Sequence, residues 1–329
     1  MDFAIQLTST TITAWQKGVG IVLSEPVTYA YTRDRRGRIF IEATGQPAVT
    51  LSEKPPLSGM QFAKFTVPQG ATGKTDEDRL AEHNANELPR AYIREIIKKL
   101  GIGRKPSIAY IIPASFPSRD LHSLRRLTVA AGAYHVEFIL APLTTAFAYG
   151  YRAGGCLSIH IGHDATDVAI FEGGKIIAGG TIATGGRAIL DGIVDHFRGY
   201  AIKIAHAQAL QLYHEVGTLF DGDTAISEVT GIDIGMHRPR EVIFTGADAA
   251  KIMYPLYEKI ARTVNQILPK VSLDVQAQIK GGAIYIGGAF SGATGLTELL
   301  TDKLDISVSI DPKSTLAQFS GAFINHASR

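Results

Sequence analysis

Two short stretches combine alternating apolar residues with a small polar turn, an arrangement in which backbone amides can bind phosphate. In the later stretch, apolar residues alternate over 157–161 and 168–170, and 162–166 is expected to form the turn between two strands. A third strand is expected over 175–178, after the Gly173-Gly174 turn. Successive amides at a hairpin tip form a concavity that binds anions, so this hairpin is a candidate phosphate-binding element.

The amino-terminal stretch repeats this pattern. Residues 3–12 predict a strand, the polar tip Thr8-Ser9-Thr10 and a second strand, and a third strand follows. Gln6 then aligns with His160, and Thr8 with Gly162. Unrelated hairpins are common, but the matched third strand favours a duplication in which each half of the chain opens on the same hairpin.

The hairpins and four later segments resemble the MreB-type bacterial actins, members of the actin/Hsp70/sugar-kinase superfold. Residues 110–115 resemble the strand and turn before a long helix, and 138–146 the link between the halves. Residues 224–245 resemble an outer subdomain, and 284–289 the adenosine loop. The resemblance covers nearly the whole chain. It implies an actin-like α/β fold of two related halves with mixed sheets around an interdomain cleft.

The resemblance also implies the domain boundaries. The first half is expected over 1–142, with a small outer subdomain at about 31–70. The second half is expected over 143–329, with an outer subdomain at about 191–250 and a last helix packing back toward the first half.

Composition limits the class of protein. The chain has 329 residues, enough for two domains, and a formal net charge of +2 that gives no reason to expect nucleic acid binding. The single cysteine, Cys156, excludes an internal disulfide and fits a reducing compartment. We see no secretory signal and no apolar run of transmembrane length. We expect a cytoplasmic protein, and the inner face of the membrane is one place where it can act.

Periodicity predicts the remaining elements, with Ser118 as the cap of its helix. Helices are expected over 80–100, 118–131, 144–151, 188–197, 207–215, 251–267, 295–304 and 316–325. Strands are expected over 107–113, 136–140, 228–234, 240–245, 283–287 and 307–310.

The resemblance places magnesium and phosphate positions in the two hairpins. In the family, an aspartate in each first strand holds hydrated magnesium, and Gln6 and His160 stand at those positions. Neither supplies the anionic oxygen that magnesium prefers. Thr8 replaces a tip glycine whose amide approaches phosphate, and His163-Asp164 replaces a glycine pair after Gly162.

Other parts of the family site are also altered. Leu140-Ala141 precede Pro142 where the family has its hydrolysis glutamate, so no base is left there to orient water. The family's contacts to sugar and base fall near Gln211 and Tyr213. Ala289-Phe290 replaces a third glycine of the adenosine loop.

These positions give a candidate nucleotide site without a catalytic residue. We expect ATP or ADP to bind weakly, and magnesium to bind only with nucleotide. Turns of the fold explain Gly162, Gly185 and Gly287 better than contact with a ligand does. His160, His163 and Asp164 carry ligating atoms, but the two histidines straddle a turn, and we expect no metal site. The cofactor-binding candidates are Thr8, Ser9, Thr10, Gly162, His163, Gly185, Gly186, Gly287 and Gly288.

A membrane contact is expected from the loop 98–105, which lies where MreB-type proteins carry a membrane-inserting loop. Leu100 and Ile102 are its exposed apolar candidates, flanked by four cations. An ordinary helix-to-strand turn with solvated lysines is the alternative.

The predicted function is an MreB-like cytoskeletal or scaffolding filament, serving cell shape or intracellular organisation, with little or no ATP hydrolysis. Its partner is expected to be itself, with further protein partners unknown. One alternative is a working ATPase filament protein whose site uses replacement residues. Another is a non-polymerising adaptor or chaperone-like relative, since this superfold serves many functions. A sugar kinase is disfavoured because no catalytic aspartate is apparent after the second hairpin.

Overall fold

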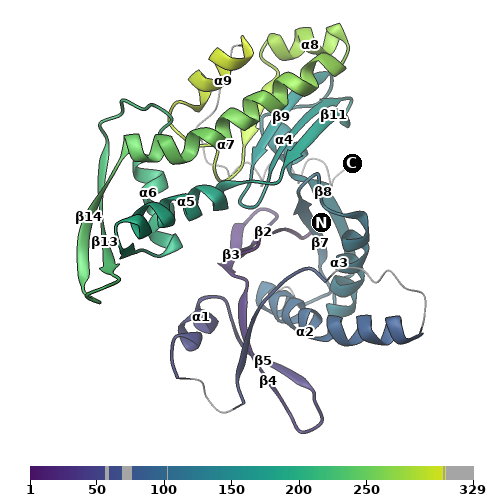
Figure 1. Cartoon of the computed structure of the whole chain (residues 1–329). Coiled ribbons are helices and arrows are strands. Elements are labelled where there is room, and N and C mark those ends of the chain that lie inside the picture. Colours follow the sequence, from purple (N-terminus) through teal and green to yellow (C-terminus); the bar gives the residue numbers. More distant parts are fainter. Residues whose placement is uncertain (56–58, 69–75, 102, 307, 309–329) are drawn as a thin grey trace. The chain divides into compact units, whose positions relative to one another are not determined.

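The computed structural model describes residues 1–55, 59–68, 76–101, 103–306 and 308 (Figure 1). Within them the chain divides into two compact units, one ending at Leu140 and the other beginning at Ala141. Each unit combines helices with mixed sheet, so the predicted α/β class is confirmed. The predicted strand 307–310 and helix 316–325 lie outside the described residues.

The first unit is built on a mixed sheet with the strand order β3-β2-β1-β7-β8. Strands β1, β2 and β3 are antiparallel, whereas β1, β7 and β8 are parallel. Helices α2 and α3 pack beside each other, and their apolar residues share a core with β1 and β7. The bounds are β1 Phe3–Leu7, β2 Thr11–Gln16, β3 Gly20–Pro26, β7 Ser107–Ile112, β8 His135–Leu140, α2 Asp76–Leu100 and α3 Ser118–Ala131.

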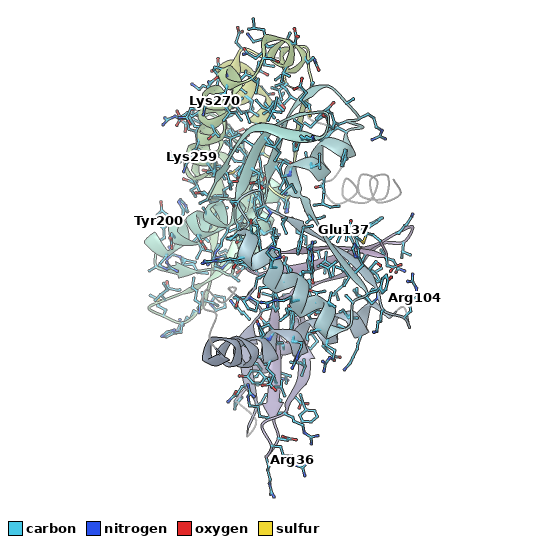
Figure 2. The ribbon with its side chains drawn as sticks, turned by 90° about the vertical axis from the view of Figure 1, so that its right-hand side faces the viewer. Arg36, Arg104, Glu137, Tyr200, Lys259 and Lys270 are labelled. Carbon is cyan, nitrogen blue, oxygen red and sulfur yellow. The ribbon has the colours of Figure 1, made fainter. Side chains whose placement is uncertain are left out.

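A second, smaller sheet in this unit has the order β5-β4-β6 and carries α1. The side chain of Arg36 projects from the tip of the β4–β5 hairpin (Figure 2). Glu25, at the end of β3, accepts hydrogen bonds from Thr44 of β5 at 2.8 Å and from Lys99 of α2 at 2.8 Å. This carboxylate therefore ties the smaller sheet to the larger one. The bounds are β4 Thr28–Arg33, β5 Ile39–Thr44, α1 Gln46–Ser52 and β6 Gln61–Lys64.

The second unit is built on a sheet of order β11-β10-β9-β15. Its core joins β9 and β10 to the apolar faces of α5, α6 and α7. The bounds are α4 Ala141–Ala148, β9 Gly155–Ile161, β10 Thr166–Glu172, β11 Lys175–Ile182, α5 Gly186–Gly199, α6 His206–Val216, α7 Gly246–Ile267, α8 Leu273–Lys280, β15 Ile284–Gly287 and α9 Leu296–Leu304.

The two large sheets open on the same arrangement, as the repeated pattern predicts. In each, an antiparallel hairpin is followed by a third antiparallel strand, and the first strand pairs in parallel with a later one. The ladder between second and third strands shifts register in both, at Ala14/Trp15 and at Ile170/Phe171. Gln6 and His160 both lie one residue before the end of their strands.

A small outer sheet of order β12-β13-β14 completes the second unit. Helix α6 packs against β13 and β14, and both strands extend beside it in Figure 1. The ribbon and its turn expose apolar side chains, including Met236 at 72% and Ile243 at 56%. The bounds are β12 Ile202–Lys203, β13 Ile226–Asp233 and β14 Pro239–Thr245.

Two sequence-based expectations are wrong. Pro117, not Ser118, caps α3, and no side-chain hydrogen bond closes that end. Leu100 is only 7% exposed because it packs into the first unit's core, so it cannot be an exposed membrane contact. Ile102 lies outside the described residues. Three of the loop's cations are also ion-paired, namely Lys98 with Glu95, Lys99 with Glu25 and Arg104 with Asp2.

Helix α7 is the long helix of the second core, and its start suggests a stability test. Thr245 accepts a hydrogen bond from the amide of Asp248 at 3.1 Å, and the Asp248 carboxylate bonds back to Thr245. We expect Thr245→Ala to lower the free energy of unfolding by about 1 kcal/mol, as lost caps of this type do. Thr245→Ser keeps the hydroxyl and should stay close to wild type in urea unfolding. Equal losses in both variants would exclude the cap as the cause.

Candidate functional site

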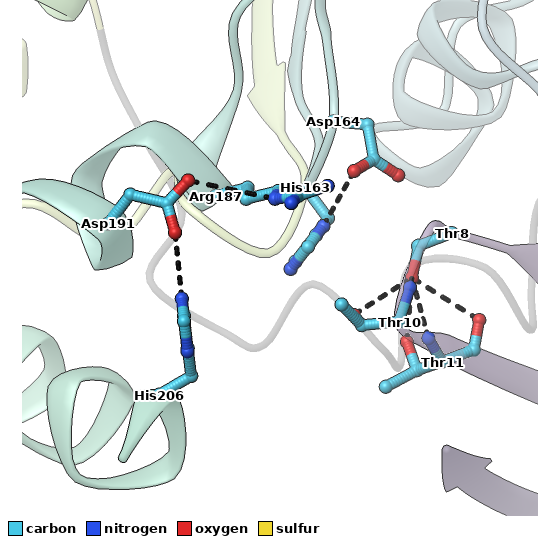
Figure 3. Close-up of polar contacts among 8 residues, drawn as sticks. All are labelled: Thr8, Thr10, Thr11, His163, Asp164, Arg187, Asp191 and His206. Atoms are coloured by element: carbon cyan, nitrogen blue, oxygen red, sulfur yellow. Dashed lines mark hydrogen bonds and ion pairs between the residues drawn. The ribbon is translucent and has the colours of Figure 1, made fainter. Parts of the chain in front are cut away.

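The tip of the first hairpin is closed by the hydroxyl of Thr8 (Figure 3). Its Oγ1 accepts hydrogen bonds from the amide of Thr10 at 3.2 Å and the amide of Thr11 at 2.9 Å. It also lies 2.9 Å from the hydroxyl oxygen of Thr11. Side-chain hydroxyls often bind nearby amides in turns in this way. Two amides of the tip therefore already have an acceptor. The Thr8 hydroxyl occupies the position that a phosphate oxygen would need to bind them.

The tip of the second hairpin is held against the start of α5 by backbone hydrogen bonds. Gly186 donates to the carbonyl of Gly162 at 2.9 Å, and Arg187 donates to the carbonyl of His163 at 2.8 Å. The amide of Gly162 in turn donates to the carbonyl of Ala165 at 3.0 Å. The first amides of a helix lack partners within it and commonly bind anions. In this chain, two of them bind carbonyl oxygens of the tip instead.

The candidate glycines allow these close backbone approaches. A Cβ placed on Gly185 would lie 2.6 Å from the carbonyl oxygens of Gly162 and His163. Gly288 has a φ of +101°, and a Cβ there would lie 2.3 Å from the carbonyl oxygen of Ile161. Glycine is therefore required at both positions by the fold alone. Their expected contact with a nucleotide stays a prediction.

The adenosine-loop candidate leads directly into a buried aromatic ring, Phe290. The ring is packed on Gly186, where an added Cβ would lie 2.0 Å from Phe290 Cδ2. It also lies 4.9 Å, centroid to centroid, from Tyr213 and 6.3 Å from the imidazole of His163. The structure thus brings the second tip, the start of α5, the Tyr213 position and the Gly287-Gly288 loop together around one side chain.

His160, at the second magnesium position, is 2% exposed. Its Nδ1 lies 2.9 Å from the hydroxyl oxygen of Thr145 on α4. Burial lowers the pKa of His160 from its ordinary value of 6.5 to about 4. The imidazole is therefore neutral at pH 7. Gln6, its counterpart in β1, is also neutral, and it pairs with Thr13 and Ile111 in the ladder.

Sequence reasoning missed a buried carboxylate opposite His160. Asp167 of β10 faces His160 in the antiparallel register, is 1% exposed and accepts a hydrogen bond from Thr181 at 2.6 Å. Directly opposed residues of a hairpin point to the same face, so the predicted register was the signal that could have identified it. A buried, hydrogen-bonded carboxylate differs from the water-facing one that hydrated magnesium requires.

Figure 3 also shows charged side chains around the second tip and α5. His163 Nδ1 lies 3.0 Å from Asp164 Oδ1. The Asp191 carboxylate contacts two side chains. It lies 3.6 Å from Arg187 Nε of its own helix and 2.7 Å from His206 Nε2 of α6. Among the described residues, no three histidine, cysteine, aspartate or glutamate side chains gather as metal ligands.

At the expected hydrolysis position, β8 ends at Leu140 and α4 begins at Ala141. Ala141 is 3% exposed, and its carbonyl accepts a hydrogen bond from Thr144 at 2.7 Å. Gln6 and the neutral His160 supply no anionic oxygen, so neither residue fits a magnesium ligand.

Because His160 is buried and neutral, we expect the free energy of unfolding to fall at acidic pH. The unfolded chain protonates this residue below pH 6.5, while the folded chain resists protonation down to about pH 4. Its contribution is therefore complete above pH 6.5 and is lost progressively as the pH falls from 6.5 to about 4. We expect a loss of about 3 kcal/mol in the free energy of unfolding, which His160→Gln should largely remove. Urea unfolding at pH 7 and pH 4.5 measures it, with His206→Gln as exposed control. An acid loss unchanged in His160→Gln would contradict this.

Three comparisons connect this chain with proteins already described. A sequence model described as MreB/Mbl protein matches residues 1–328. The cell shape-determining protein MreB of Escherichia coli is 24% identical over 97% of this chain and 92% of its own length. The cell shape-determining protein Mbl of Bacillus subtilis is 23% identical over 99% of this chain and 96% of its own.

Solved structures share the fold. The crystal structure of MreB5 of Spiroplasma citri bound to ADP has a TM-score of 0.76 at 18% identity, and covers 99% of this chain and 96% of its own. MamK, solved as a double helical filament, has a TM-score of 0.71 at 15% identity, and covers 99% and 98%. The fold is therefore actin-like. With the match to the family model over residues 1–328, the chain belongs to the MreB/Mbl family.

Proposed function

We propose that this chain is an actin-like filament protein of the cell-shape or scaffolding kind, with a degenerate nucleotide site. The observation that carries the degenerate site is the first tip, where the Thr8 hydroxyl already binds the amides of Thr10 and Thr11. The lack of charge on Gln6 and His160 points the same way, because magnesium requires anionic oxygen ligands.

Two observations support self-assembly, namely the names of the relatives in the family and the exposed apolar surface of the β13–β14 ribbon. The relatives are named cell shape-determining proteins, and MamK was solved as a filament. In this chain, the β13–β14 ribbon carries exposed apolar side chains at its turn, with Ile234 at 45% and Met236 at 72%. A head-to-tail contact between unlike surfaces does not close on itself and so gives open filaments. We propose that the two halves cover residues 1–142 and 143–329, and that the outer subdomain at about 191–250 forms part of the contact.

A working ATPase is the second candidate. It is favoured by the neighbours, since MreB5 of Spiroplasma citri was solved with ADP and with AMPPNP. It would require Gln6 or His160 to contact phosphate or water directly. The burial of His160 against Thr145 argues against that role, because the ring is 2% exposed.

We expect the purified protein to assemble into protofilaments without nucleotide. Met236→Asp places a charge on the exposed turn and should abolish assembly, whereas Met236→Leu keeps the surface apolar and should assemble normally. Pelleting, light scattering and electron microscopy, with and without ATP, measure the outcome. A protein that stays monomeric at high concentration in every condition would indicate the adaptor class instead.

We expect little or no magnesium-dependent ATP hydrolysis. The missing glutamate before Pro142 removes the group that orients water, and removal of such a group typically costs about a hundredfold or more in rate. Phosphate release measures hydrolysis, and calorimetry with ATP and magnesium measures binding separately. Hydrolysis at a rate usual for the family, abolished by Gln6→Ala or His160→Ala, would establish the ATPase candidate.

A restored variant is the matched test of the same site. Gln6→Asp and His160→Asp return the carboxylates, Thr8→Gly frees the amides of the first tip, and Ala141→Glu returns the hydrolysis group. The combined variant should bind ATP more tightly with magnesium than without it. Wild type should show no such difference. Equal binding of the variant with and without magnesium would contradict the assignment of these positions.

A further inference from the structure

The side chain of Phe290 is unusual in where it lies rather than in how well it is buried. It is 2% exposed and belongs to the core cluster of the second unit. Yet its neighbours are not an arbitrary set of core residues. They include Gly186, Tyr213 and His163, and each of these stands at or near a position that the family resemblance assigns to nucleotide contact.

The backbone holds this ring in place from two sides. The amide of Phe290 donates to the carbonyl of Ile161 in β9 at 3.2 Å, and its carbonyl accepts a hydrogen bond from Tyr257 of α7 at 2.6 Å. The hydroxyl of Tyr213 lies 3.4 Å from that of Tyr257. The ring is therefore fixed between β9, α6 and α7, and does not depend on a ligand for its position.

The space that the ring occupies suits a flat aromatic group. Gly186 has no side chain, so one ring face lies directly on the start of α5, and a Cβ there would overlap the ring. Tyr213 packs on it with ring planes inclined by 50°. Pockets for planar ligands are lined by aromatic groups in this manner. The surfaces around the phenyl ring therefore suit a planar apolar group.

We propose that Phe290 is a built-in plug that occupies the adenosine subsite of this chain. This inference rests on the proposed degenerate nucleotide site. The ring supplies the apolar contacts that a bound base would make, so the core of the second unit is fully packed without nucleotide. Nucleotide then binds only in molecules whose ring has left the subsite, and the apparent affinity falls by that fraction.

Removal of the ring tests the plug. In Phe290→Gly, adenosine should bind about tenfold or more tightly than in wild type, because the subsite no longer has to be vacated. Adenosine should also raise the midpoint of thermal unfolding of Phe290→Gly but not of wild type, since a ligand that binds the folded state stabilises it. Calorimetry and thermal unfolding with adenosine measure the two effects.

A matched core variant and a second ligand keep the test specific. Phe197 is 1% exposed in the same core, and Phe197→Gly removes an equal ring elsewhere. Benzene fills apolar cavities of this kind without regard to nucleotide chemistry. If benzene stabilises Phe290→Gly and adenosine does not, or if adenosine stabilises Phe197→Gly equally, Phe290 is an ordinary core residue and the plug is refuted. If Phe290→Gly does not fold, Phe290→Ala and Phe290→Leu replace it in the same comparison.

The plug and the filament can fail separately. Adenosine binding by Phe290→Gly in a protein that never assembles would support the plug and refute the filament. Assembly of wild type together with tight adenosine binding by wild type would refute the plug and leave the filament intact.

Discussion

The close approach of the second hairpin to the start of α5 is the constraint on which the site depends. Two carbonyls of the tip accept the amides of Gly186 and Arg187, and Gly185 makes this possible because any side chain there would overlap the tip. Once these bonds form, the tip, the helix and the ring of Phe290 have fixed positions. The amides of Gly186 and Arg187, which an anion could otherwise meet, are bonded within the protein, and a buried backbone polar group is seldom left unpaired.

In both tips, backbone amides already have acceptors within the protein, but the acceptors differ. In the first, the hydroxyl of Thr8 binds the amides, and the β-branched side chain of this residue limits the backbone. In the second, main-chain carbonyls bind the helix amides, and a glycine at 162 remains. The halves are related in topology, down to a register shift between the second and third strands of each. Their likeness thus lies in strand order, while the chemistry at the tips has diverged.

Much of the fold could be predicted from the sequence, because strands and amphipathic helices impose periods of their own. Both hairpins, α3, α6 and α7 are near their expected positions. Helices α1 and α8 were not predicted, since they are short and leave few periods to detect. The expected exposure of Leu100 failed for a different reason, because the last turn of α2 packs inward and its neighbours in sequence do not show that.

The site was harder to predict because the role of each residue depends on neighbours that lie far away in the sequence. The sequence shows which residue types have been exchanged, and from that Gln6 and His160 could be assigned as poor magnesium ligands. It does not show that Thr145 lies beside His160, or that a phenyl ring fills the space next to Gly186. A lost ligand contact and a newly packed core give the same substitution in a sequence. In the structure Phe290 is held by hydrogen bonds to two elements and packed by a third, as the proposed plug requires. A protein that has replaced ligand contacts by its own side chains keeps the stability that the ligand once gave, and so can retain the fold without the chemistry.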